Sequence, residues 1–159
     1  MKNITVKSAS SKDAAILRHL AKICPPLDVH TQYTYWAVAE YFGDCCFIAY
    51  NDEEPIGYIM CIRNDEVFFV WQIGIVKEYR GKGISSLLIK KAFERAESTN
   101  YGLISVTIAK ENNESFRAFS KYCEKNGYSF DAVETVQVTD LDDPSFSEAE
   151  VMYHIRKAK

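Results

Sequence analysis

The hydrophobic and polar positions of this chain change their period several times, and each change marks the border of an element. Stretches in which apolar residues alternate with polar ones or run together predict strands, whereas apolar residues three and four positions apart predict helices. This pattern predicts seven strands, at residues 4–6, 46–50, 56–62, 67–76, 103–109, 128–138 and 150–156. It predicts four helices, from Ser10 or Ser11 to Ile23, from about Thr31 to Phe42, from Ile84 to about Ser98, and from Asn112 or Asn113 to Gly127.

Turn residues between these elements indicate how they connect. Pro25 and Pro26 end the first helix, and polar turns at 51–55 and 63–65 predict an antiparallel meander of strands. The strand at 103–109 follows a helix, so a right-handed crossover should place it parallel to the strand at 67–76. The order predicts an α/β (α+β) fold in a single domain, residues 1–159, with a mixed sheet of six to seven strands flanked by four helices.

Helical spacing also predicts which side chains face the core. The second helix is aromatic on several sides, which is typical of a helix that is buried or beside a pocket. The positions expected to face inward are Leu17, Leu20 and Ala21 in the first helix, Ile84, Leu87, Leu88, Ala92 and Ala96 in the third, and Phe116, Phe119 and Cys123 in the fourth.

Composition narrows the class of protein. The chain of 159 residues is 47% hydrophobic and 26% charged, with a net charge of −3, which argues against a nucleic-acid partner. No apolar run has membrane-spanning length and no basic-then-apolar leader is visible, so we expect a cytoplasmic protein that is not in a membrane. The five cysteines contain no Cys-x-x-Cys pair, so we expect buried thiols and no metal site or disulfide framework.

Residues 70–88 carry the strongest chemical signal. An apolar strand ends in a polar loop with glycines, and a helix follows at once. Such a junction points backbone N–H groups and the positive end of the helix dipole at one spot, which favours phosphate. The loop matches neither the P-loop pattern nor the dinucleotide-binding pattern. An ordinary helix start with turn glycines is the simpler alternative.

The loop resembles the acyl-CoA pyrophosphate loop of the GNAT N-acetyltransferase superfamily, Gln/Arg-x-x-Gly-x-Gly/Ala. Arg80, Gly83 and Ser85 take the three positions, with serine departing from Gly/Ala. The element order is also that of the superfamily, so the resemblance covers nearly the whole chain and implies acetyl-CoA as cosubstrate. The contacts that it implies for acetyl-CoA are Ile73, Gly74, Ile75, Val76, Arg80, Gly81, Lys82, Gly83, Ile84, Ser85, Ser86, Asn112, Ser115 and Phe119.

Gly74 lies inside a predicted strand, which suggests a β-bulge in the central strand. A bulge there would separate this strand from the one at 103–109. In the superfamily such a gap takes the pantetheine arm, whose amides would pair with Ile73 and Ile75. An N–H near Ile73 could then stabilise the oxyanion. A glycine needed for close packing is the alternative.

Four segments resemble the diaminobutyrate acetyltransferases of ectoine synthesis more narrowly. They are Leu27-Asp28-Val29-His30-Thr31-Gln32-Tyr33-Thr34-Tyr35, Phe69-Val70-Trp71-Gln72-Ile73, the run from Thr107 to Ser115, and Glu150-Val151-Met152-Tyr153. This resemblance implies a small-molecule amine as partner, with Asp28, Trp71 and Glu150 as its contacts. The chain departs from the family at His30-Thr31, which replaces Asn-Ser, at Lys110, where the family has proline, and at Ser147, where it has histidine.

Several interpretations stay open at this point. The acceptor could be a diamino acid such as diaminobutyrate, a polyamine or a peptide N-terminus, or the domain could bind CoA without catalysis. Small acetyltransferases of this kind often pair their late strands, so a homodimer is possible. Asp28, Trp71, Asn112 and Glu150 each have an ordinary structural interpretation as well, as a turn residue, a core aromatic, a helix cap and a solvated strand residue.

The usual acid of the superfamily is absent. Many members protonate the leaving thiolate with a tyrosine seven residues after the fourth-helix asparagine, and that position is Phe119 here. Tyr33 matches a tyrosine of the narrower family and is our first candidate for the catalytic acid, with helix packing as the alternative. Tyr122, about one turn further along the same helix, is the second candidate, with an exposed or core tyrosine as the alternative. Direct attack with proton loss to water is also open.

Overall fold

Eleven helices and strands follow one another between residues 3 and 159, the part of the chain that the computed structural model describes. The predicted order is confirmed, and the borders move by a few residues. The elements are β1 (Ile4–Ser8), α1 (Ala14–Lys22), α2 (Gln32–Phe42), β2 (Phe47–Asn51), β3 (Glu54–Arg63), β4 (Val67–Ile75), α3 (Ile84–Ser98), β5 (Leu103–Ile108), α4 (Asn113–Asn126), β6 (Tyr128–Thr139) and β7 (Ser147–Lys157).

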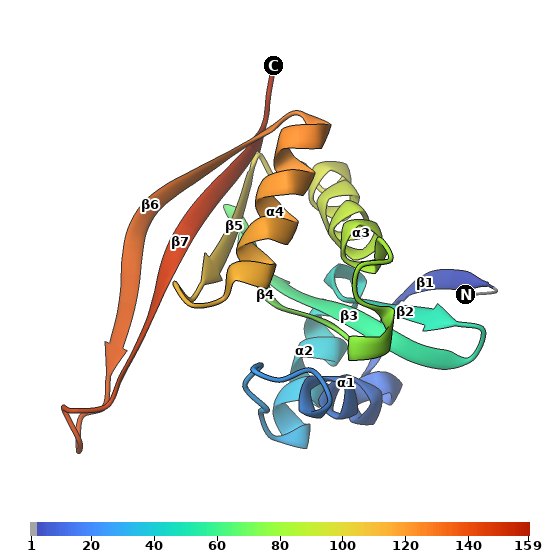
Figure 1. The fold of residues 1–159 in the computed structure, drawn as a ribbon, viewed down its shortest axis with the longest axis horizontal. Helices are drawn as coiled ribbons and strands as arrows, with labels where there is room; N and C mark the ends of the chain where they lie inside the picture. The colour runs from blue at the N-terminus through green and yellow to red at the C-terminus, as the bar shows by residue number, and fades with distance from the viewer. Residues whose placement is uncertain (1–2) are drawn as a thin grey trace.

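The strands form one mixed sheet in the order β1-β2-β3-β4-β5-β7-β6. β4 and β5 run parallel, as the crossover through α3 predicted, and the other neighbouring strands of this sheet are antiparallel. β6 and β7 form a long hairpin that extends away from the helices (Figure 1). β7 therefore lies between β5 and β6, although it comes last in the chain.

Helices cover both faces of the sheet (Figure 1). α3 and α4 pack on one face, where Phe68, Phe93 and Phe119 belong to one buried cluster. α1 and α2 pack on the other face, where Leu17 and Tyr35 belong to a second cluster. Within residues 3–159, none of the helices combines the length and the apolar character that crossing a membrane requires.

The predicted inward faces are confirmed for α1 and corrected at two positions elsewhere. Leu87 of α3 and Phe116 of α4 are each 41% exposed. In α3 the buried residues also include Ile89 and Phe93, so the buried face is centred on the side of the helix away from Leu87. In α4 the ring of Phe116 lies at the edge of the core, with its centroid 5.7 Å from that of Phe130 on β6.

The second helix is less buried than its aromatic content predicted. Tyr35 is fully buried, but Tyr33 is 74% exposed and Tyr41 is 69% exposed. Thr31 caps this helix by accepting a hydrogen bond from the backbone N–H of Thr34 at 3.1 Å. The cap fixes the start of the helix, and the resulting phase turns Tyr35 toward the sheet and Tyr33 toward solvent.

The central strand β4 carries the predicted bulge, but at Trp71 instead of Gly74. Met60 pairs with Gln72 and Cys61 pairs with Val70, so Trp71 is the extra residue on β4. Gly74 pairs regularly with Tyr58. A Cβ atom at Gly74 would lie only 2.8 Å from Cδ1 of Leu27, so this glycine serves close packing, the alternative noted above.

The bulge reverses the faces that the strand presents, because one extra residue shifts the alternation of side chains. Before it, Phe68 and Val70 belong to the cluster under α3 and α4. After it, the side chain of Gln72 hydrogen-bonds Tyr35 and Tyr58 on the opposite face. The pairing of β4 with β5 also stops at Val70, so the two strands part from the bulge onward.

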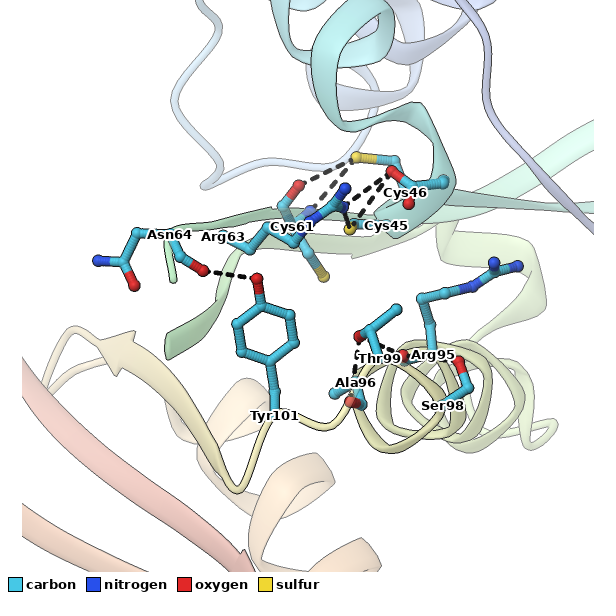
Figure 2. A network of polar contacts seen from close by, with 11 residues as sticks. Cys45, Cys46, Cys61, Arg63, Asn64, Arg95, Ala96, Ser98, Thr99 and Tyr101 are labelled. Atoms are coloured by element: carbon cyan, nitrogen blue, oxygen red, sulfur yellow. Dashed lines mark hydrogen bonds and ion pairs between the residues drawn. The ribbon is translucent and has the colours of Figure 1, made fainter. Parts of the chain in front are cut away.

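The five cysteines are free and buried, as predicted. The thiol of Cys46 donates a hydrogen bond to the carbonyl of Cys61 at 3.3 Å (Figure 2). In the same region Arg63 contacts the carboxylate of Asp44 at 2.9 Å and the sulfur of Cys45. Burial raises the pKa of the Cys46 thiol to about 12, so we assign these contacts to packing of the turn before β2 against β3.

Candidate active site

Two cavities meet where β4 and β5 part. The first, about 510 Å³, lies between the glycine loop, the start of α3 and one side of α4, and we call it the basic cavity. The second, about 500 Å³, lies between the α1–α2 loop, the bulge of β4, β5 and the start of β7, and we call it the acidic cavity. The residues that line both are Pro26, Leu27, Ile73, Asn112 and Ser115.

The glycine loop prepares the basic cavity for an anion. Gly81 and Gly83 have φ values of +74° and +82°, in the left-handed region that glycine adopts most easily. Gly83 is the N-cap of α3 and has no side chain that could accept hydrogen bonds from the first turn. The first-turn N–H groups of α3 are therefore left for a ligand, with the helix dipole behind them.

Side chains add positive charge to this cavity. Arg80, Arg117 and Lys121 line it together with Glu114. The Nε of Arg80 donates to the carbonyl of Ile75 at 3.0 Å, and its Nη1 lies 3.6 Å from Oε2 of Glu114. Arg117 and Lys121 were absent from the sequence prediction, although their spacing of four on α4 places them on one side of that helix.

The backbone of β4 directs polar groups toward the gap. The N–H of Val76 donates to the carbonyl of Ile56 on β3 at 2.9 Å. Because backbone groups alternate sides along an antiparallel strand, the N–H groups of Ile73 and Ile75 point away from β3, toward the gap. The contact of Arg80 with the Ile75 carbonyl agrees with this direction. An amide-containing chain could pair with β4 here.

The acidic cavity has the opposite charge. Asp28, Glu111, Glu148 and Glu150 line it, and its lining contains neither lysine nor arginine. Trp71, the bulge residue, forms an aromatic wall with the ring of His30, the two centroids being 5.0 Å apart. A cationic ligand would be favoured in this cavity because the carboxylates can form charge-assisted hydrogen bonds with it.

Glu150 has an unusual environment among these carboxylates. Burial raises its pKa from the ordinary value of 4.5, and the carboxylates of Asp28 and Glu148 raise it further. A hydrogen bond with the hydroxyl of Thr107 acts in the opposite direction. A carboxylate in a cavity with a raised pKa is suited to accept and release a proton.

The α1–α2 loop is held in place by a buried polar group. The side chain of Gln72 donates to the carbonyl of Asp28 at 2.8 Å and accepts from the hydroxyls of Tyr58 at 2.8 Å and Tyr35 at 3.2 Å. The Nε of Arg18 donates to the carbonyl of His30 at 3.0 Å. The Nε2 atom of His30 is buried and has no partner among the described residues.

Most of the residues predicted from the sequence come together at these cavities. Asp28, Trp71 and Glu150 line the acidic cavity, as does Phe119. Asn112 caps α4 by accepting from the N–H of Ser115 at 3.1 Å, and both residues line both cavities. The predicted acetyl-CoA contacts that line the basic cavity are Ile73, Gly74, Ile75, Arg80, Gly81, Gly83, Ile84, Ser85 and Ser86, whereas Val76 and Lys82 line neither cavity.

The two candidate acids lie elsewhere. Tyr33 lines neither cavity, and its ring lies against Trp36 with centroids 5.4 Å apart. Tyr122 packs edge to face on Phe93 at 5.4 Å and also lines neither cavity. Tyr122 packs against the core and so fits its structural alternative, whereas Tyr33 is 74% exposed at the surface of α2.

We therefore expect Tyr33→Phe to keep its turnover within about twofold of wild type, as a surface substitution does. Tyr41→Phe is the matched control, since Tyr41 is a similarly exposed tyrosine on the same helix. Initial rates at saturating substrates, measured across pH, test this expectation. A tenfold loss of turnover in Tyr33→Phe but not in Tyr41→Phe would indicate that Tyr33 takes part in catalysis.

Comparisons with known proteins agree with this geometry. The family model described as "Acetyltransferase (GNAT) family" matches residues 14–124. An L-2,4-diaminobutyric acid acetyltransferase of Shouchella clausii is 31% identical over 74% of this chain and 67% of its own length. One of Halomonas elongata is 30% identical over 76% of this chain and 65% of its own length. The matches thus span about two thirds of these curated relatives.

Solved structures share the fold. The diaminobutyrate acetyltransferase EctA of Paenibacillus lautus, in complex with L-2,4-diaminobutyric acid and coenzyme A, superposes with a TM-score of 0.81 at 22% identity. The similarity covers 98% of this chain and 96% of that one. The ribosomal-protein-S18-alanine N-acetyltransferase of Escherichia coli gives a TM-score of 0.77 at 10% identity, covering 99% and 96%.

Proposed function

Because the chain belongs to the GNAT acetyltransferase family, we propose that it transfers the acetyl group of acetyl-CoA to a primary amine of a small acceptor. The leading candidate is a diamino acid such as 2,4-diaminobutyrate, on which the named relatives act. The observation that carries the proposal is the meeting of a basic and an acidic cavity at Ile73.

Acetyl-CoA fits the basic cavity. The N–H groups at the start of α3, with Arg80, Arg117 and Lys121, suit its phosphates. The N–H groups of Ile73 and Ile75 that face the gap suit the amides of the pantetheine arm. This placement brings the thioester to Ile73, where the two cavities join, and a backbone N–H there can stabilise the oxyanion of the tetrahedral intermediate.

The acceptor amine fits the acidic cavity. Asp28 and Glu150 line the same cavity of about 500 Å³, so both can act on one small molecule. One carboxylate can hold an ammonium group by a charge-assisted hydrogen bond and so orient the attacking nitrogen toward the thioester. Trp71 limits the length of the acceptor from the side of the bulge.

The attacking nitrogen must lose a proton before it can act, since a free alkyl ammonium has a pKa of about 10. We assign this proton to Glu150, because burial and the neighbouring carboxylates raise its pKa toward that of the amine. The nitrogen then attacks the thioester carbon, the carbon–sulfur bond breaks, and the CoA thiolate takes up a proton from solvent.

An amine panel tests the proposed function. The purified protein is incubated with acetyl-CoA and one of five acceptors: 2,4-diaminobutyrate, 1,3-diaminopropane, spermidine, a short peptide or a neutral monoamine. We expect saturable thiol release with the diamino acid and an increase in melting temperature with acetyl-CoA. Release with only the peptide or the monoamine would contradict the small-diamine acceptor. A thermal shift without release for any amine would indicate a CoA-binding module.

A further inference from the structure

The side chain of Gln72 is buried beside the acidic cavity and forms hydrogen bonds with Tyr35, Tyr58 and the backbone of Asp28. Gln72 and Ser105 are the two polar residues counted as buried among the described residues. All three hydrogen bonds of the Gln72 side chain go to groups that are not on β4. A buried amide is costly unless it is satisfied, and Gln72 uses both lone pairs of its oxygen and one of its N–H groups.

These bonds converge on the backbone of the segment Asp28–His30. Gln72 donates to the carbonyl of Asp28 at 2.8 Å. The hydroxyl of Tyr35, which donates to Gln72, lies 3.5 Å from the N–H of His30 and accepts from it. Arg18 donates to the carbonyl of His30 at 3.0 Å. The segment is thus tied to β4, α2 and α1 at its backbone, which leaves the Asp28 side chain to face the acidic cavity.

The bulge at Trp71 makes this arrangement possible. Without the extra residue, Gln72 would lie on the same face as Phe68 and Val70, under α3 and α4. With it, Gln72 lies beneath the α1–α2 loop, directly after the residue that forms the cavity wall. One irregularity of the strand therefore places both the cavity wall, Trp71, and the residue that anchors the Asp28 backbone, Gln72.

We propose that Gln72 is a positioning residue that sets where Asp28 holds the acceptor's ammonium group, and that it acts through its hydrogen bond to the Asp28 backbone. This inference rests on the proposed function. It goes further in making the affinity for the acceptor depend on a buried side chain of β4. It also predicts that Gln72 affects the KM for the acceptor and not the KM for acetyl-CoA, because Gln72 lines the acidic cavity and not the basic one.

The test is a double-mutant cycle between Gln72→Met and Asp28→Asn, with steady-state kinetics for both substrates. We expect Gln72→Met to raise the KM for the acceptor about tenfold, with the KM for acetyl-CoA and kcat within about twofold of wild type. Asp28→Asn should raise the acceptor KM by a similar factor. Because Gln72 acts through Asp28, Gln72→Met should add less than about twofold in the Asp28→Asn background.

Two further variants keep the result interpretable. Gln72→Met leaves two buried tyrosine hydroxyls without a partner, so the triple variant Tyr35→Phe, Tyr58→Phe and Gln72→Met replaces the whole group by apolar side chains, which is milder for folding. It carries the same test if the single variant unfolds. Ser105→Ala is the control, since it removes the other buried polar side chain from the same sheet, outside both cavities.

The outcomes are distinguishable. Additive effects of Gln72→Met and Asp28→Asn, or equal increases in both Michaelis constants, would overturn the positioning role and leave the proposed function standing. An Asp28→Asn variant with the acceptor KM of wild type would instead remove the proposed acceptor site, and this inference with it. Non-additive effects confined to the acceptor support the proposal.

Discussion

Replacing Glu150 with glutamine is expected to lower kcat for the acceptor by about a hundredfold or more, which corresponds to about 2.7 kcal/mol of barrier. Glutamine keeps the size of the side chain and its contact with Thr107 but cannot accept the proton of the ammonium group. The KM for acetyl-CoA should stay unchanged, since Glu150 does not line the basic cavity. Stopped-flow or steady-state assays of thiol release measure both values.

The pH dependence gives the same prediction a second test. The pKa of Glu150 is raised, so its carboxylate becomes protonated at a higher pH than an ordinary glutamate as the solution is made more acidic. The wild-type rate should therefore fall on the acid side at a pH above 4.5, the ordinary value for this side chain. Glu150→Gln should lose this acid limb.

Glu134→Gln on β6 is the control for this prediction. Glu134 is exposed, lies opposite Met152 on β7 and lines neither cavity, so its replacement tests the removal of a nearby charge alone. If Glu150→Gln kept wild-type turnover and an unchanged acid limb, Glu150 would have no role in proton transfer.

Replacing Gly83 with valine is expected to weaken acetyl-CoA binding by about a hundredfold or more, because a branched side chain would stand where the helix start meets the phosphates. A Cβ atom at Gly83 would meet no protein atom within 4 Å, so the space in front of it is open for the ligand. Isothermal titration with acetyl-CoA measures the effect directly.

The strain of the substitution has a matched control in the same chain. Gly127 caps the end of α4 with a φ of +77°, close to the +82° of Gly83, and a Cβ there also meets no atom within 4 Å. Gly127→Val should therefore cost similar folding stability, yet leave acetyl-CoA affinity unchanged because Gly127 lines neither cavity. Equal losses of affinity in both variants would show that strain, and not the phosphate site, explains Gly83→Val.

Most of the lining of the basic cavity was predictable because its signal is local. One continuous stretch supplies the end of β4, the glycine loop and the start of α3, so the motif and its neighbours could be read in order. The acidic cavity takes Asp28, Trp71, Thr107 and Glu150 from segments far apart in the chain, and only the fold brings them together. Glu111 and Glu148 were missed for this reason.

The bulge shows a second limit of prediction from the sequence. A glycine inside a strand is a common sign of a bulge, and Gly74 carried that prediction. The extra residue is Trp71 instead, and no unusual residue type marks it. Since a shift of one residue exchanges the two faces of a strand, the position of the bulge decides whether Gln72 lies under α3 or beneath the α1–α2 loop.

Tyr33 shows a third limit. The segment that resembles the narrower family contains two tyrosines two positions apart, and residues two apart on a helix do not share a face. The N-cap at Thr31 decides the phase, so Tyr35 turns toward the sheet and Tyr33 toward solvent. An aromatic run such as this one gives no periodic signal that would have told them apart.

The late insertion of β7 between β5 and β6 has a consequence for the newly made chain. Ribosomes release a polypeptide from its N-terminus, so every residue that lines the basic cavity emerges before β7 does. Until then β5 has an unpaired edge, which can associate with other strands, and Glu150 is missing from the acidic cavity. Pairing of β7 with β5 therefore closes this edge and completes the acidic cavity in the same step.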